Sequence, residues 1–112
     1  DMGDRKMDII VYMSPTCDHT DEILPLMEEC LAECGVSTGY QTVETRDFED
    51  AKEKKSLGCP TIRTNGVDIE YGPQEPEEYT SGCRYYNTLD GWKPMPPKNL
   101  IIGGIKRAQE KQ

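Results

Sequence analysis

The hydrophobic residues of this chain gather into short runs separated by polar and turn-forming residues. A β-branched run, Ile9-Ile10-Val11-Tyr12-Met13, is short enough to be a buried strand, which we place at residues 7–13. From about Asp21 the spacing changes, and apolar residues recur at the period of a helix: Ile23, Met27, Cys30 and Cys34. This spacing predicts an amphipathic helix that Gly35 ends as a cap, and Pro25 should kink it or limit it near its first turns.

The middle of the chain predicts a strand, a short helix and a hairpin. Residues 40–45 alternate as a strand does, and residues 47–56 begin with acidic residues and indicate a helix. Residues 57–64 read as another strand, which a proline leads in. Asn65-Gly66 is the strongest short signal for a hairpin turn, so residues 67–71 form the returning strand.

A long connection separates this hairpin from the last helix. Residues 72–97 are rich in glycine and proline, and the segment is too long for a plain turn, so we expect a functional or covering loop with some local structure. The last helix runs from about Pro97 to Gln109, and Gly103-Gly104 within it indicates a close approach to the sheet. The element order β-α-β-α-β-β-α predicts an α/β fold with a mixed four-stranded sheet flanked by helices on both faces.

Composition narrows the classes of protein to consider. The 112 residues suffice for one domain, residues 1–112, with a modest core. A net charge of −8 without a basic cluster argues against nucleic acid and anionic membranes as partners. No apolar run is long enough to span a membrane, and the first residues lack a signal-peptide pattern. The five cysteines are an odd number without the spacing of a disulfide scaffold, so we expect a cytoplasmic protein with one or more working thiols.

Cys17 is the first candidate for chemistry. It lies between the end of the first predicted strand and the start of the first predicted helix. The positive end of the helix dipole and the unpaired backbone N–H groups at that position favour thiolate over thiol. Cys17 is therefore expected to be a nucleophile toward a disulfide or a soft electrophile, or a metal ligand; the alternative is an inert turn residue.

The element order and three local patterns resemble the thioredoxin/glutaredoxin superfamily. Cys17-Asp18-His19-Thr20 lies where that family carries C-x-x-C, and Pro25 stands where thioredoxins have the proline of the kinked helix. Cys59-Pro60-Thr61 lies where the family has a cis proline followed by threonine, facing the active cysteine. The resemblance covers roughly residues 7–71 and the last helix. It implies a thioredoxin-like fold with a long loop insertion before that helix, and it implies that Pro60 is cis.

A narrower likeness and one departure refine this expectation. The segment from Leu57 to Ile69, with the later C-R-Y-Y and P-P-K-N-L-I, looks like small prokaryotic thioredoxin-like proteins grouped with alkylmercury lyase. Position 20, however, is threonine, so the second cysteine of the redox pair is missing. What remains resembles the motif of monothiol glutaredoxin-like relatives, in which Thr20 would donate a hydrogen bond to the Cys17 thiolate.

The resemblance also assigns expectations to the residues around Cys17. Cys59, just before the implied cis proline, would be a resolving thiol or a second metal ligand, or else a small buried residue at a strand start. Cys83 would be a third thiol at the site, a disulfide partner for Cys59, or a structural residue of the connection. Pro60 and Thr61 would contact substrate. His19 would do so too, or would tune Cys17 or bind metal, or would simply be a solvated imidazole.

The remaining cysteines and aromatic residues have simpler interpretations. Cys30 and Cys34 share the apolar face of the first helix, and free cysteines are often buried, so we expect them in the core. Several aromatic residues fall in or beside the long connection, where they would line a cleft over Cys17 or, as we prefer, form a small satellite core: Tyr71, Tyr79, Tyr85, Tyr86 and Trp92.

Three functions follow from these expectations. The first is a thiol–disulfide oxidoreductase without a cofactor, in which Cys17 attacks a protein or low-molecular-weight disulfide. Thr20 would stabilise the leaving thiolate, and the mixed disulfide would be resolved by Cys59, Cys83 or an external thiol. The second is a protein that binds or transfers a soft metal ion such as Cu(I), Zn(II) or Hg(II) through Cys17, Cys59 and Cys83. The third is a non-catalytic thioredoxin-like domain for protein contact.

Overall fold

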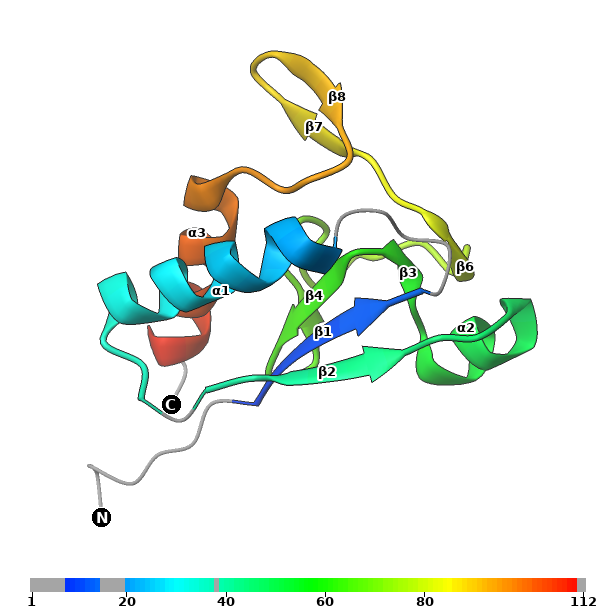
Figure 1. Ribbon diagram of the computed structural model, residues 1–112, viewed down its shortest axis with the longest axis horizontal. Helices are drawn as coiled ribbons and strands as arrows, with labels where there is room; N and C mark the ends of the chain where they lie inside the picture. Colours follow the sequence, from blue (N-terminus) through cyan, green and yellow to red (C-terminus); the bar gives the residue numbers. More distant parts are fainter. Residues whose placement is uncertain (1–7, 15–19, 38, 111–112) are drawn as a thin grey trace.

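The computed structural model describes residues 8–14, 20–37 and 39–110, with the side chains of all these residues except Thr20, Ser81 and Cys83. The elements in chain order are β1 (Ile9–Met13), α1 (Thr20–Cys34), β2 (Gln41–Glu44), α2 (Phe48–Lys54), β3 (Leu57–Cys59), β4 (Thr61–Thr64), β5 (Val67–Asp68), β6 (Thr80–Cys83), β7 (Tyr86–Thr88), β8 (Gly91–Lys93) and α3 (Lys98–Glu110). Figure 1 shows their arrangement in space.

The main sheet has four strands in the order β2-β1-β4-β5. β1 and β2 are parallel, whereas β1 and β4, and also β4 and β5, are antiparallel. The expected α/β fold with a mixed four-stranded sheet is therefore confirmed. The part of the chain that the structure describes contains no helix long and apolar enough to cross a membrane.

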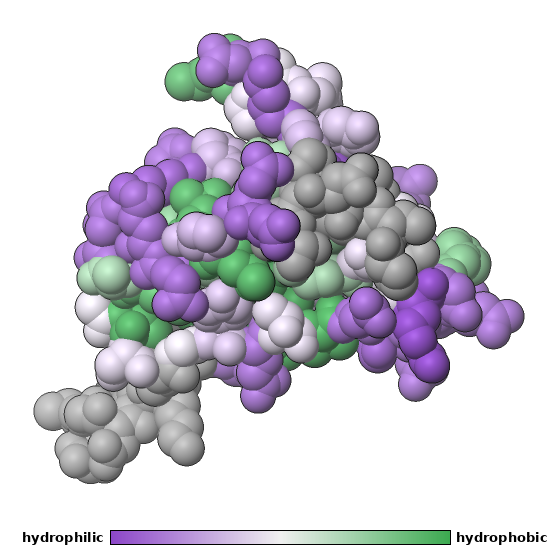
Figure 2. All heavy atoms as spheres, in the orientation of Figure 1, coloured by the Kyte–Doolittle hydropathy of each residue, from purple (hydrophilic) through white to green (hydrophobic). Residues whose placement is uncertain are grey.

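The hydrophobic core lies between this sheet and the pair of helices α1 and α3. Alternate residues of β1 are buried, and they meet buried residues of both helices: Ile9, Val11 and Met13 from β1, Ile23 and Met27 from α1, and Ile101 and Ile105 from α3. The two helices contact each other, while α2 contacts β6 and follows β2 beyond the end of that strand (Figure 1). In Figure 2, hydrophilic side chains gather over α2 and over the outer side of α1.

Several local predictions can be compared with these helices. Gly35 follows α1 with a positive φ of 69°, as a cap residue does, and α1 continues through Pro25 as one helix of 15 residues. In α2, Asp50 and Lys54 are one turn apart and form an ion pair at 3.1 Å. The close approach that Gly103-Gly104 indicated is made by Gly104 alone. A Cβ on Gly104 would lie 2.6 Å from Ile69 Cγ2, whereas a Cβ on Gly103 would meet nothing within 4 Å.

The hairpin region departs from the sequence-based expectation in two ways. The single strand expected at residues 57–64 is two strands, because the chain breaks at Pro60, and β3 leaves the main sheet to pair with β6. The strand expected at residues 67–71 ends at Asp68, because the carboxylate of Asp68 accepts the backbone N–H groups of Glu70 and Tyr71 and turns the chain.

The long connection contains three short strands. β6 pairs in parallel with β3, and β7 and β8 form a separate two-stranded hairpin. Figure 1 shows this hairpin standing away from the main sheet, above α1 and α3. The connection thus has the local structure that its length indicated, and its first strand lies directly beside Cys59.

Candidate functional site

The candidate site is the end of the sheet at which β1 finishes and β4 begins. Tyr12 on β1 is the register partner of Thr61 on β4, so the chain that leads from β1 toward Cys17 starts beside Pro60 and Thr61. The peptide bond between Cys59 and Pro60 is cis, as the resemblance implies. Cys17 and His19 lie outside the described residues, between the end of β1 and the start of α1, and Thr20 is the first residue of α1.

Cys59 is buried, with 2% of its surface exposed, and it is disulfide-bonded. In this state its sulfur is neither a nucleophile nor a thiolate ligand. Cys30 and Cys34 have free thiols. Along the backbone, Cys59 on β3 is the register partner of Cys83 on β6, so the two Cα positions lie opposite each other in the parallel pair.

Backbone hydrogen bonds hold β6 against β3 on both sides of this register position. The N–H of Thr80 donates to the carbonyl of Ser56 at 2.8 Å, and the N–H of Arg84 donates to the carbonyl of Cys59 at 3.0 Å. The approach is close enough to require glycine at position 58. Gly58 has a φ of +113°, and a Cβ there would lie 2.8 Å from the Cβ of Arg84.

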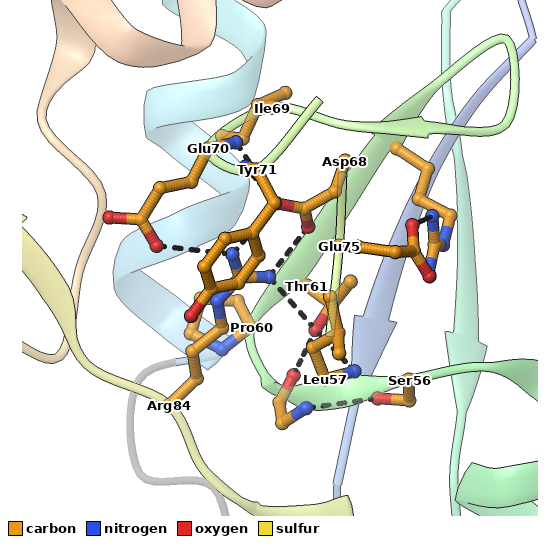
Figure 3. Close-up of polar contacts among 12 residues, drawn as sticks. Ser56, Leu57, Pro60, Thr61, Asp68, Ile69, Glu70, Tyr71, Glu75 and Arg84 are labelled. Atoms are coloured by element: carbon orange, nitrogen blue, oxygen red, sulfur yellow. Dashed lines mark hydrogen bonds and ion pairs between the residues drawn. The ribbon is translucent and has the colours of Figure 1, made fainter. Parts of the chain in front are cut away.

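A buried ion pair lies next to this disulfide position. The guanidinium of Arg84, the residue that follows Cys83, donates to both carboxylate oxygens of Asp68 at 2.7 and 2.8 Å (Figure 3). Asp68 is fully buried and Arg84 is 5% exposed. The guanidinium also reaches Glu70 at 3.3 Å and the hydroxyl of Thr61 at 3.3 Å. Arg84 therefore joins the connection to β4, to β5 and to the turn that follows β5.

Two tyrosine rings enclose the guanidinium of Arg84. Its central carbon lies 4.4 Å from the centroid of the Tyr86 ring and 5.2 Å from that of Tyr71. The hydroxyl of Tyr86 donates to the carbonyl of Pro60 at 2.5 Å, so this side chain connects the same arginine to the cis peptide. Of the aromatic residues assigned to a satellite core, Tyr86 lies instead in the main core, and Tyr71, Tyr85 and Trp92 are exposed.

Thr61 fixes the short loop between β3 and β4. Its hydroxyl donates to the carbonyl of Gly58 and accepts the N–H of Leu57 at 3.0 Å. The same oxygen accepts a bond from Arg84. Because Thr61 is completely buried, its hydroxyl is occupied by these structural bonds, and it holds the backbone on both sides of Pro60 in place.

The contacts between Asp68 and Arg84 favour the ionised forms of both side chains. Burial on its own would raise the pKa of Asp68, but the hydrogen bonds and positive charge of Arg84, together with two backbone N–H groups, bring it below its usual value. Burial likewise opposes the charge of Arg84, yet the bonds from Asp68 raise its pKa. Burial raises the pKa of Tyr86, so its hydroxyl remains a donor.

A second, partly buried ion pair holds the connection farther from Cys59. Arg63 on β4 donates to both carboxylate oxygens of Glu75 at 2.6 and 2.8 Å, and it also bonds the carbonyl of Lys55. The hydroxyl of Tyr79 donates to Glu75 at 3.1 Å. The connection is thus tied to the sheet by two arginine–carboxylate pairs, of which only the Asp68–Arg84 pair adjoins the cysteines.

The two cysteines of α1 are far less reactive than a site thiol. Cys30 is fully buried and Cys34 is half-buried, in agreement with their assignment to the core. Burial raises the pKa of Cys30 to about 11 and raises that of Cys34 above its usual value. Both thiols are therefore protonated at neutral pH.

The sequence reasoning missed Asp68 and Arg84. The expected strand at residues 67–71 gave Asp68 no role, and Arg84 appeared only within the C-R-Y-Y segment. The available signal was that an arginine directly follows a cysteine and precedes two tyrosines, in a connection whose other charged residues, apart from Lys93, are acidic. Among the described side chains, no group of three or more histidine, cysteine or acidic residues is arranged to hold a metal ion.

An open hollow lies between the first turn of α1 and the β7–β8 hairpin. Its lining includes Glu22 on α1 and Asp90, Lys93 and Met95 from the connection. It is therefore next to the helix end that follows Cys17 in the chain. No family model, no curated protein and no solved structure matches this sequence.

Proposed function

We propose that this protein is a thiol–disulfide oxidoreductase of thioredoxin-like fold in which Cys17 is the attacking thiol. The observation that carries the proposal is the β1–β4 register, which brings the end of β1 beside the Cys59–Pro60 peptide, with Cys59 already in a disulfide. Support for the fold comes from the element order. With β3 and β4 taken as one segment broken at Pro60 and β6 to β8 as an insertion, it is β-α-β-α-β-β-α.

The proposed reaction consists of two thiol–disulfide exchanges. The Cys17 thiolate attacks one sulfur of the substrate disulfide, forms a mixed disulfide and releases the other half of the substrate as a thiolate. A second thiolate then attacks the Cys17 sulfur of the mixed disulfide. It forms a new disulfide with Cys17 and releases the remaining half of the substrate as a thiolate. With Cys59 oxidised, this second thiolate comes from an external low-molecular-weight thiol; after reduction, Cys59 itself can serve.

The proposal includes the partner of Cys59. After a register shift that follows Leu57, the parallel pairing places Cys83 opposite Cys59, and the adjacent bond from the N–H of Arg84 to the carbonyl of Cys59 holds this position, so we assign Cys83 as the residue bonded to Cys59. Reduction of this pair by two electrons and two protons would release two thiols next to Pro60. Soft-metal binding by Cys17, Cys59 and Cys83 would require this reduced form, because a thiolate is the ligand and a disulfide is not.

The test compares Cys17→Ser with Cys34→Ser. Reduction of a small aromatic disulfide is followed in the presence of glutathione, with wild-type protein as the reference. We expect Cys17→Ser to lower the rate at least ~100-fold, because a serine hydroxyl does not replace a thiolate nucleophile. Cys34→Ser is the matched control and should keep the wild-type rate, since the Cys34 thiol is half-buried with a raised pKa.

Two outcomes would overturn the oxidoreductase proposal. If Cys17→Ser reduces the disulfide as fast as wild type, Cys17 is not the nucleophile and a non-catalytic interaction domain remains. If neither protein has activity, but the reduced protein binds one Hg(II) or Cu(I) ion and Cys59→Ala abolishes that binding, the protein is a soft-metal carrier.

A further inference from the structure

Arg84 makes several of the contacts that hold β6 in place on β3. Arg84 contributes the backbone N–H that bonds Cys59, and its side chain is the only described side chain of the connection that bonds Asp68. Its Cβ packs where Gly58 leaves space. Any shift of Arg84 would therefore move the backbone of its neighbour, Cys83, relative to Cys59.

Asp68 in turn is held rigidly from the main sheet. Its carboxylate accepts two N–H groups of the turn after β5, from Glu70 at 3.0 Å and from Tyr71 at 2.9 Å, in addition to the two bonds from Arg84. β5 pairs with β4, which continues directly from Pro60. The Asp68 carboxylate thus links the main sheet, through Arg84, to the strand that contains Cys83.

We propose that Asp68, acting through Arg84, is a positioning residue that sets how easily the Cys59–Cys83 disulfide is reduced. The inference rests on the cysteine pairing that the proposed function includes. In the reduced protein, the ion pair would keep the two thiols opposite each other at a high effective concentration, which favours the disulfide. Without the ion pair, β6 keeps its backbone bonds to β3 and its contacts with α2 but loses its link to β5, and the two thiols separate more readily after reduction.

The experiment measures the disulfide itself and uses no enzyme substrate. The full chain is equilibrated in buffers of reduced and oxidised dithiothreitol, in which the dithiol supplies two electrons and two protons and becomes a cyclic disulfide. Free thiols are alkylated, and mass mapping gives the reduced fraction at Cys59 and identifies its partner. We expect Asp68→Asn to raise the equilibrium constant for reduction about tenfold, which is ~30 mV for this two-electron couple.

Two further variants separate positioning from general stability. Glu75→Gln breaks the other, partly buried ion pair of the connection and should lower the unfolding temperature while leaving the equilibrium constant within about twofold of wild type. Asp68→Asn/Arg84→Met removes both buried charges and avoids an unpaired arginine, so it remains informative if Asp68→Asn does not fold. It should also make the disulfide about tenfold easier to reduce.

The inference is overturned if the variants at Asp68 keep the wild-type equilibrium constant within about twofold while their unfolding temperatures fall. It is equally overturned if mass mapping shows Cys59 bonded to a residue other than Cys83. Neither result depends on whether Cys17 has activity. If the Cys17→Ser test contradicts the oxidoreductase proposal, the reduction equilibrium of the Cys59 disulfide can still be measured. Failure of the proposed function and failure of this inference are therefore distinguishable.

Discussion

The carboxylate of Asp68 shows how this protein stabilises a charge inside its core. Four hydrogen bonds reach it, two from Arg84 and two from backbone N–H groups. Such a pair is costly to break on one side, because the remaining partner keeps its charge without water; typical losses are about 3–5 kcal/mol. We therefore expect Asp68→Asn to destabilise the protein more than Asp68→Asn/Arg84→Met does.

The lowered pKa of Asp68 predicts a dependence of stability on pH. The unfolded state binds a proton at the ordinary pKa, about 3.9, and the folded state binds it only at lower pH. The stabilisation is therefore present above the unfolded value and is lost as the pH falls through the folded value. Denaturant unfolding from pH 6 to pH 2.5 should give a steeper loss for wild type than for Asp68→Asn, by up to ~1.4 kcal/mol per pH unit.

Asp50, whose pKa is also lowered by hydrogen bonds, is present in both proteins and contributes equally to the two curves. Glu75, whose pKa is lowered by its hydrogen bonds with Arg63, is present in both proteins too, but the negative charge of Asp68 partly opposes this lowering, so the difference between the curves reports Asp68 together with this smaller effect on Glu75. Parallel curves for wild type and Asp68→Asn would show that Asp68 does not titrate below its ordinary range, and the account of the buried pair would be wrong.

At the scale of single elements, we expect alanine substitutions at two neighbouring glycines of α3 to have opposite effects on stability. Gly103 on α3 is exposed with no atom within 4 Å of an added Cβ, so Gly103→Ala should stabilise the helix by ~0.5–1 kcal/mol. At Gly104 an added Cβ would overlap Ile69, and Gly104→Ala should destabilise by ~1–3 kcal/mol. Thermal or urea unfolding measures both, and a loss of stability in Gly103→Ala would contradict the described packing of α3.

The elements also show how far sequence patterns reach. The strand of Ile9 to Met13, the helix that Gly35 ends and the turn at Asn65-Gly66 were predictable, because local periodicity and capping chemistry determine them. The pairing of β3 with β6, and not with a strand of the main sheet, was not predictable. It depends on a pairing between residues 57–59 and 80–83, and no local pattern encodes which distant segment an edge strand will bind.

The same reason explains which part of the candidate site was missed. Cys59 and Pro60 could be singled out from their local motif, but the Asp68–Arg84 pair joins two segments 16 residues apart in the chain. The expected strand at residues 67–71 gave no reason to assign Asp68 a partner. In the structure the strand ends at Asp68, and the buried carboxylate bonds both Arg84 and the backbone N–H groups of the following turn.

At the scale of the whole molecule, the fold brings three kinds of feature to one end of the main sheet. The chain leading to Cys17 leaves β1 there, the oxidised Cys59 and Pro60 enter β4 there, and the buried Asp68–Arg84 pair holds the connection beside them. The core between the sheet and the α1–α3 pair forms the rigid base for this arrangement. We propose that this base is structural and that the chemistry belongs to Cys17.

The most direct test of that central claim is to find which cysteine exchanges with a disulfide. The protein is incubated with oxidised glutathione, and free thiols are alkylated before mass mapping. We expect one glutathione per chain, bound to Cys17. Cys30 and Cys34 should stay unmodified, because their thiols have raised pKa values. An adduct on Cys34, or the absence of any adduct on Cys17, would contradict the proposed function.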